Sequence, residues 1–127
     1  MTAHRQELGK TGEDLAVAEL EARGYAILAR RYRTRHGEID VVARERDTTV
    51  FVEVKARTSA DFGGGADAVT AWKQRRLVSM ATDYLVRHRL TERPCRFDVV
   101  AIDLVGAEAS RGSGRPQVTI YRNAFDA

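Results

Sequence analysis

Apolar residues recur along the chain with two spacings, and each spacing predicts a type of secondary structure. In residues 7–23 and 70–88 they lie three or four positions apart, which is typical of amphipathic helices. Gly24, directly after the first of these segments, is a common C-terminal stop of a helix. Shorter apolar runs predict five strands, at residues 25–32, 36–43, 49–56, 96–104 and 117–121.

The predicted elements follow the order α-β-β-β-α-β-β, which indicates the α/β class with a mixed β-sheet flanked by helices. The strand at residues 96–104 suits a central position in the sheet, and the short last strand suits an edge. We expect a single domain over residues 1–127, with its core at about 7–121. A flexible Gly/Ser-rich connection is expected at 105–116 and a tail at 122–127.

The composition indicates a globular protein and excludes several classes. Of the 127 residues 43% are hydrophobic and 31% are charged, the balance of a folded domain rather than a disordered chain. Cys95 is the only cysteine, which excludes a disulfide framework and a cysteine-ligated zinc site. The N-terminal residues contain no apolar run, and nowhere do about 18 apolar residues stand together. We therefore expect a cytoplasmic protein with no membrane partner.

Basic residues gather in two clusters, although the net charge is only +3 and the pI 9.3. The first cluster has four arginines around an aromatic residue, and the second stands at the start of the second predicted helix. Such clusters are typical of proteins that bind a phosphate backbone, although solvated basic faces are the alternative. The candidate nucleic-acid contacts are Arg30, Arg31, Arg33, Arg35, Lys73, Arg75 and Arg76.

Acidic residues and a lysine stand on the second and third predicted strands, which a four-residue loop at 45–48 would join as a hairpin. A loop centred there places Asp40 opposite Glu53, and Glu38 opposite Lys55. Because side chains alternate between the two faces of a strand, all four would share one patch of the sheet. A slip of one residue would abolish this arrangement.

Two carboxylates held this close repel each other unless a cation lies between them or one of them keeps a proton. Oxygen ligands suit Mg²⁺ or Mn²⁺, and a nearby ammonium can orient water and stabilise charge on a phosphoryl oxygen. These are the parts of a metal-assisted phosphodiester hydrolase, in which loss of either carboxylate should leave the metal-free protein as stable or more stable. The alternative is a Glu–Lys ion-pair ladder without metal, in which the same changes should affect mainly stability.

Glu13, Asp40 and Glu53-Val54-Lys55 together resemble the PD-(D/E)xK nuclease superfamily, and most closely its Holliday-junction-resolvase branch. Nearly the whole chain resembles the YraN family of uncharacterised bacterial proteins. The matching phrases are residues 12–13, 37–40, 51–55, 73–77 and 96–101.

This resemblance implies a restriction-endonuclease-like core and a Mg²⁺- or Mn²⁺-dependent endonuclease acting on DNA, with branched or structured DNA as one candidate substrate. Asp40 and Glu53 would be metal ligands together with the main-chain carbonyl of Val54, and Lys55 would position the attacking water. Glu13 would complete the site directly or through a water molecule, and Lys73 would contact a phosphate. A homodimer would be expected if both strands of a duplex are cut.

The position of Glu13 agrees with this role, because it lines up with Val17 and Leu20 on the apolar stripe of the first helix. Two departures stand beside the resemblance. Ile39 replaces the proline of the superfamily's name, and the role of Glu38 is open, a pairing with Lys55 being one suggestion. A shared fold does not guarantee a shared activity, so a non-catalytic nucleic-acid-binding module is the alternative function.

Aromatic residues of the second helix have two interpretations. Trp72 and Tyr84 could stack on bases, but on an amphipathic helix we expect them to pack in the core. The glycine-rich segment at 59–67 is expected to form a flap or entrance loop beside the site, rather than a phosphate cradle.

Overall fold

The computed structural model describes residues 3–57, 70–103 and 116–125, with residues 3–10 and Arg57 described by their backbone alone. It contains two helices and five strands in the order α-β-β-β-α-β-β, so the predicted class and element order are confirmed. The helices are α1 (Ala3–Ala22) and α2 (Ala71–Arg87). The strands are β1 (Ala26–Thr34), β2 (Gly37–Glu45), β3 (Thr48–Arg57), β4 (Cys95–Asp103) and β5 (Gln117–Phe125).

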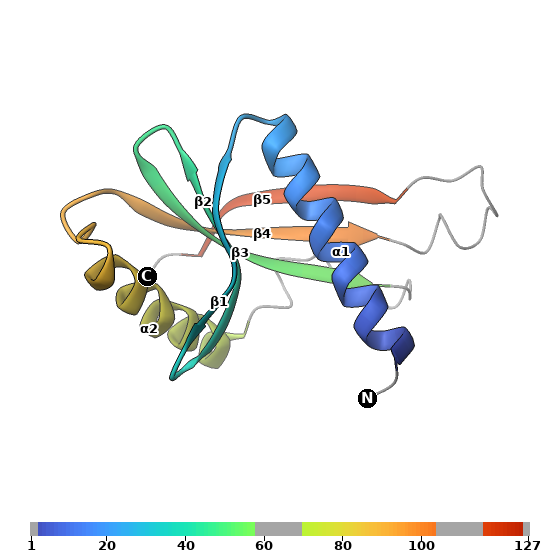
Figure 1. Ribbon diagram of the computed structural model, residues 1–127, viewed down its shortest axis with the longest axis horizontal. Helices are drawn as coiled ribbons and strands as arrows, with labels where there is room; N and C mark the ends of the chain where they lie inside the picture. The colour runs from blue at the N-terminus through green and yellow to red at the C-terminus, as the bar shows by residue number, and fades with distance from the viewer. Residues whose placement is uncertain (1–2, 58–69, 104–115, 126–127) are drawn as a thin grey trace.

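The five strands form one mixed sheet in the order β1-β2-β3-β4-β5 (Figure 1). The pairs β1–β2, β2–β3 and β4–β5 are antiparallel, whereas β3 and β4 are parallel. A parallel pair needs a crossover connection, and α2 lies within that connection. The strand at residues 96–104 was predicted to be central and the last strand to be an edge, and β4 and β5 confirm both positions.

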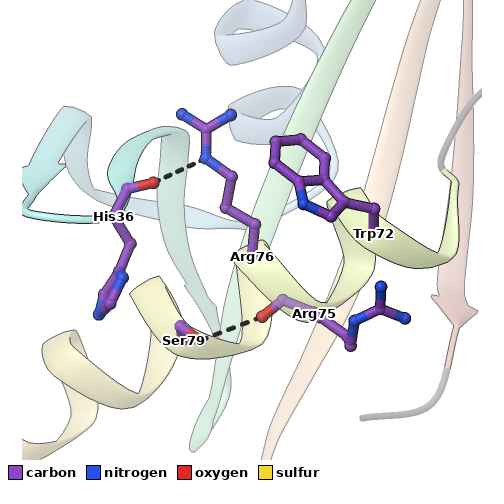
Figure 2. A pocket seen from close by; sticks show the side chains of 5 residues that line it. All are labelled: His36, Trp72, Arg75, Arg76 and Ser79. Carbon is purple, nitrogen blue, oxygen red and sulfur yellow. Dashed lines mark hydrogen bonds between the residues drawn. The ribbon is translucent and has the colours of Figure 1, made fainter.

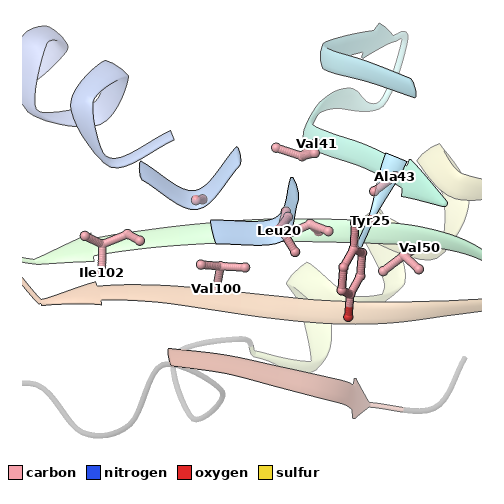
Figure 3. Close-up of a cluster of buried hydrophobic side chains, with 9 residues drawn as sticks. Leu20, Tyr25, Val41, Ala43, Val50, Val100 and Ile102 are labelled. Carbon is pink, nitrogen blue, oxygen red and sulfur yellow. The ribbon is translucent and has the colours of Figure 1, made fainter. Parts of the chain in front are cut away.

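The helices cover opposite faces of the sheet, and each packs on its own cluster of buried apolar side chains. Leu20 of α1 packs with Val41, Val52 and Val100 in the first cluster, part of which Figure 3 shows. The second cluster, under α2, contains Ile39, Val42, Phe51, Leu77, Met80, Ala81, Tyr84, Phe97 and Val99.

The β2–β3 hairpin has the predicted register, with Val41 opposite Val52 and Ala43 opposite Val50. Its loop is shorter than predicted, because Glu45 and Thr48 pair with each other and leave only two residues between the strands. Arg46 in this loop has φ +57°, the left-handed conformation that two-residue hairpin loops require.

The alternation of side chains breaks where β1 and β2 pass the site. Ile39 and Val42 both pack under α2, although strict alternation would put them on opposite faces. On β1, Ala29 and Tyr32 share that face in the same way, and Arg31 between them has φ +53°. This irregularity changes which side chains of β2 share a face with β3.

The C-terminal strand continues to Phe125, beyond the predicted end at 121, so most of the predicted tail is part of the sheet. The extension is stabilised by stacking of Phe125 on Phe97, with ring centroids 4.7 Å apart, and by an ion pair between Arg122 and Glu45 at 2.7 Å. The glycine-rich loop at 59–67 and most of the connection at 105–116 lie outside the described residues. Among the described helices none is long and apolar enough to cross a membrane.

Candidate active site

Asp40 lies where β2 and β3 stop pairing. The last pair of the ladder is Val41 and Val52, and Asp40 and Glu53 are the next residues of the two strands. Beyond that pair the Asp40 carboxylate takes the place of the backbone, because its Oδ2 accepts a hydrogen bond of 2.8 Å from the main-chain N–H of Val54. The side chain of Asp40 is thereby fixed beside β3, on the segment that carries Glu53.

Glu53 is buried and binds two lysines from different elements. The Nζ of Lys73 lies 2.6 Å from Glu53 Oε1, and the Nζ of Lys55 lies 3.4 Å from the same oxygen. Lys55 is two residues further along β3 and therefore shares a face with Glu53. Lys73 comes from the first turn of α2, where its N–H donates to the side chain of the N-cap residue Thr70 at 3.2 Å. Two ammonium groups thus converge on one carboxylate.

The charges of the site perturb each other. Burial, and then the nearby charge of Glu53, raise the pKa of the Asp40 carboxyl to about 7, against the opposing hydrogen bond from Val54. Burial and the neighbouring ammonium of Lys73 lower the pKa of Lys55. Burial acts to lower the pKa of Lys73, but its contacts with Glu53 and Lys55 and the nearby charge of Asp40 together raise it. Such opposed shifts in one cluster are typical of catalytic sites, although structural ion pairs also produce them.

Glu13 lies on the side of α1 that faces the sheet, as its place on the apolar stripe predicted, and it is only 7% exposed. Its two carboxylate oxygens accept hydrogen bonds of 3.1 Å from the Nε atoms of Arg30 and Arg31 on β1. Gly12 lets the helix approach the sheet here, because a Cβ on Gly12 would lie 2.7 Å from that of Ala56. The charge of Glu13 contributes to the raised pKa of Asp40, so the two carboxylates share one electrostatic environment.

The donor set suits a hard divalent cation only in part. No group of three or more histidine, cysteine, aspartate or glutamate side chains that could hold a metal is found in the described part of the chain. Mg²⁺ commonly uses only one or two carboxylates and completes its coordination with water and substrate phosphate. Asp40 and Glu53 can supply those two carboxylates, and the nearby charge of Glu53 contributes, after burial, to the raised pKa of Asp40, a repulsion that a cation between the two would relieve.

Comparison with known proteins places the chain in a family. The model of "Uncharacterised protein family UPF0102" matches residues 12–102. The chain belongs to the UPF0102 family. A UPF0102 protein of Anaeromyxobacter dehalogenans is 46% identical over 122 residues, which cover 96% of this chain and 86% of that protein. One from Geobacter metallireducens is 44% identical over 126 residues, covering 99% and 98%.

This is the family that the sequence resemblance indicated under the name YraN. The match spans the elements that build the site, from Gly12 on α1 to Ile102 on β4.

The arginines predicted to contact nucleic acid differ in their partners and in their exposure in this UPF0102 chain. Arg30 and Arg31 bind Glu13, although Arg31 keeps about half of its side chain exposed, at 53%. The side chain of Arg33 is 87% exposed and pairs with Glu38 at 3.2 Å. Three further arginines of the predicted nucleic-acid contacts are exposed, one on the turn after β1 and two on α2: Arg35, Arg75 and Arg76.

Two suggestions from the sequence are wrong in the UPF0102 structure. Glu38 was suggested to pair with Lys55, but it pairs with Arg33, while Lys55 contacts Glu53. The broken alternation at Asp40 explains this, because Glu38 no longer follows the face that a regular strand would give it. Trp72 was expected in the core and is 62% exposed, whereas Tyr84 is buried as expected.

Sequence reasoning missed the direct contact of Lys73 with Glu53, since it assigned Lys73 to a substrate phosphate. It also missed a buried polar cluster on β4 of this UPF0102 chain. Asp98, 1% exposed, accepts hydrogen bonds from Arg96 Nε at 3.0 Å, from the Tyr25 hydroxyl at 3.2 Å and from the N–H of Asn123 at 2.9 Å. The only sequence signal for it is an acidic residue within an apolar strand.

Proposed function

We propose that this protein is a divalent-metal-dependent nuclease that hydrolyses phosphodiester bonds of DNA. The observation that carries the proposal is the convergence of Asp40, Glu53, Lys55 and Lys73 where β2 and β3 separate. Two carboxylates able to share a cation, next to an ammonium with a lowered pKa, are the groups that metal-assisted phosphodiester hydrolysis needs.

Each residue has a distinct role in this proposal. Asp40 and Glu53, with the main-chain carbonyl of Val54, would hold a Mg²⁺ or Mn²⁺ ion. The chemistry that such an ion supplies is polarisation of a phosphoryl oxygen and a lower pKa of water. Lys55 orients the attacking water and stabilises the negative charge that develops on the phosphoryl oxygens. Lys73 fixes the orientation of Glu53, as their 2.6 Å contact supports.

The bond changes are those of a simple hydrolysis. The water oxygen forms a bond to phosphorus while the ester bond to the departing sugar oxygen breaks, and the proton that the water loses is balanced by the proton that the sugar oxygen gains from solvent. Glu13 does not bind Lys55 or Lys73; its oxygens are bound by Arg30 and Arg31. We therefore assign Glu13 to positioning β1 arginines beside the site, with any contact to the cation made through water.

A non-catalytic nucleic-acid-binding module is the second candidate. It is favoured by one observation, the close contact of both lysines with Glu53, which already compensates the charge of that carboxylate. In such a module the cluster would be a structural ion-pair network, and the exposed arginines of β1 and α2 would bind phosphates.

A cleavage assay separates the two candidates. Wild type and Glu53→Ala are incubated with labelled single-stranded, duplex, flap and four-way-junction DNA in Mg²⁺, Mn²⁺ or EDTA. The nuclease proposal predicts cleavage by wild type that EDTA and the substitution abolish. Binding without cleavage, weakened by salt, would support the second candidate, and neither binding nor cleavage would contradict both.

A further inference from the structure

A surface pocket of about 540 Å³ lies beside the N-terminal turns of α2. Its lining comes from α2 and from the turn between β1 and β2, as Figure 2 shows. Among the residues that the structure describes, the lining contains one large aromatic ring, two arginines and no acidic residue: His36, Trp72, Arg75, Arg76 and Ser79. An open aromatic pocket with a positive lining suits a ligand that has both a flat ring and negative charge.

Trp72 is exposed, and its ring is held in place by a contact with Arg76. Its side chain is 62% exposed, and the guanidinium carbon of Arg76 lies 5.5 Å from the centre of its ring. Arg76 is fixed in turn, because its Nε donates a hydrogen bond of 2.6 Å to the main-chain oxygen of His36. Gly37, with φ +131°, leaves room for that guanidinium, which a Cβ at this position would overlap. One face of the ring is thus covered by Arg76 in the free protein.

The pocket and the candidate active site meet at the first turn of α2, because each takes one of two consecutive residues of that turn. Trp72 directly precedes Lys73, whose Nζ lies 2.6 Å from Glu53. Both residues stand in the first turn of α2, so a nucleic-acid strand bound at Glu53 would have a neighbouring nucleotide within reach of Trp72. Arg75 lies in the same pocket and can contact the flanking phosphate.

We propose that this pocket binds an unpaired nucleobase of the substrate strand, which stacks on Trp72 next to the bond that is cut. The inference rests on the proposed function and names its substrate class: nucleic acid with an unpaired nucleotide beside the cleavage site. Bases within an intact duplex have their faces covered by neighbouring pairs, so they cannot enter such a pocket without leaving the stack. The protein should therefore prefer single-stranded segments and ends to a blunt duplex.

Trp72 is the only tryptophan of the chain, so its intrinsic fluorescence reports on this pocket alone. The experiment titrates wild type with a single-stranded oligonucleotide and with the corresponding blunt duplex, in EDTA so that no turnover is needed. We expect quenching of Trp72 by the single strand and much less by the duplex. Labelled oligonucleotides then give affinities for Trp72→Ala, Trp72→Phe and the control Val86→Ala, which removes another exposed apolar side chain of α2.

Loss of the indole should weaken single-strand binding by roughly tenfold, with the phenylalanine variant keeping most of the affinity and the control all of it. The affinity for the duplex should be the same in wild type and in the three variants. Single-strand binding without quenching, or equal losses for both nucleic acids in Trp72→Ala, would overturn this inference and leave the nuclease proposal intact. Binding of neither nucleic acid would overturn both.

Discussion

Replacing Lys55 by methionine should reduce DNA cleavage in Mg²⁺ or Mn²⁺ by roughly 10²–10³-fold. Lys55 contacts Glu53 at 3.4 Å, and burial lowers its pKa, so it is the ammonium placed to orient water and stabilise the developing charge. Methionine has a similar length without the charge. Glu53 keeps its shorter contact with Lys73 in this variant, so the protein should remain folded. Initial rates on a labelled substrate, beside a thermal melt, measure both effects.

The control is Arg87→Met, which removes a basic side chain at the C-terminal end of α2. Arg87 pairs with Asp83 at 3.4 Å, and its side chain is 67% exposed, so its loss should leave the cleavage rate unchanged. Lys55→Arg should not restore activity, because a guanidinium differs in shape and hydration from an ammonium. A Lys55→Met protein that cleaves at the wild-type rate would exclude Lys55 from the chemistry.

The Asp40→Asn substitution should stabilise the protein in EDTA, by about 1–3 kcal/mol at pH 8. Asparagine can still accept the hydrogen bond from Val54 through its side-chain oxygen, but it removes a half-buried charge that lies near Glu53. Glu53→Gln should have the opposite effect, because it leaves Lys55 and Lys73 without their shared carboxylate. The sequence alone predicted equal or greater stability in both cases, and the two lysine contacts reverse the expectation for Glu53.

The stabilisation by Asp40→Asn should depend on pH. The Asp40 carboxyl has its pKa near 3.8 when unperturbed and near 7 in the folded protein. Between these values the folded state keeps a proton that the unfolded state has lost, so the free energy of unfolding falls as the pH rises. Wild type should therefore lose stability relative to Asp40→Asn between about pH 4 and pH 7. Urea unfolding of both proteins measures this. If wild type and Asp40→Asn have the same dependence of unfolding free energy on pH, or if Asp40→Asn is less stable than wild type at pH 8, then the charge of Asp40 is compensated in the folded state.

The part of the site that lies on one hairpin could be predicted from the sequence. Alternating apolar residues fix which side of a strand is buried, and the short loop after β2 fixes the register, so Asp40 and Glu53 could be placed next to each other. Glu13 could be placed on the buried side of α1, because helical spacing alone relates it to Leu20.

The remaining part depends on contacts between distant segments and on local irregularities. Lys73 reaches Glu53 only because α2 crosses over the sheet between β3 and β4, a placement that no local pattern specifies. The left-handed conformation of Arg31 breaks the alternation of β1, and arginine gives no sequence signal for such a conformation. Trp72 was expected in the core because α2 is amphipathic, but helical spacing puts it on the same face as the exposed Arg76 rather than in line with the buried Leu77.

Asp40 and Glu53 should together hold a divalent cation, and calorimetric titration of Mn²⁺ into the DNA-free protein tests this most directly. Wild type should bind Mn²⁺, and Asp40→Asn should bind it at least about tenfold more weakly, since it loses one of two carboxylate ligands. Glu38→Gln is the matched control, because Glu38 lies two residues away on β2 and pairs with Arg33 instead. This control should bind Mn²⁺ as tightly as wild type does. Absence of Mn²⁺ binding by wild type, or equal binding by Asp40→Asn, would contradict the proposed cation site.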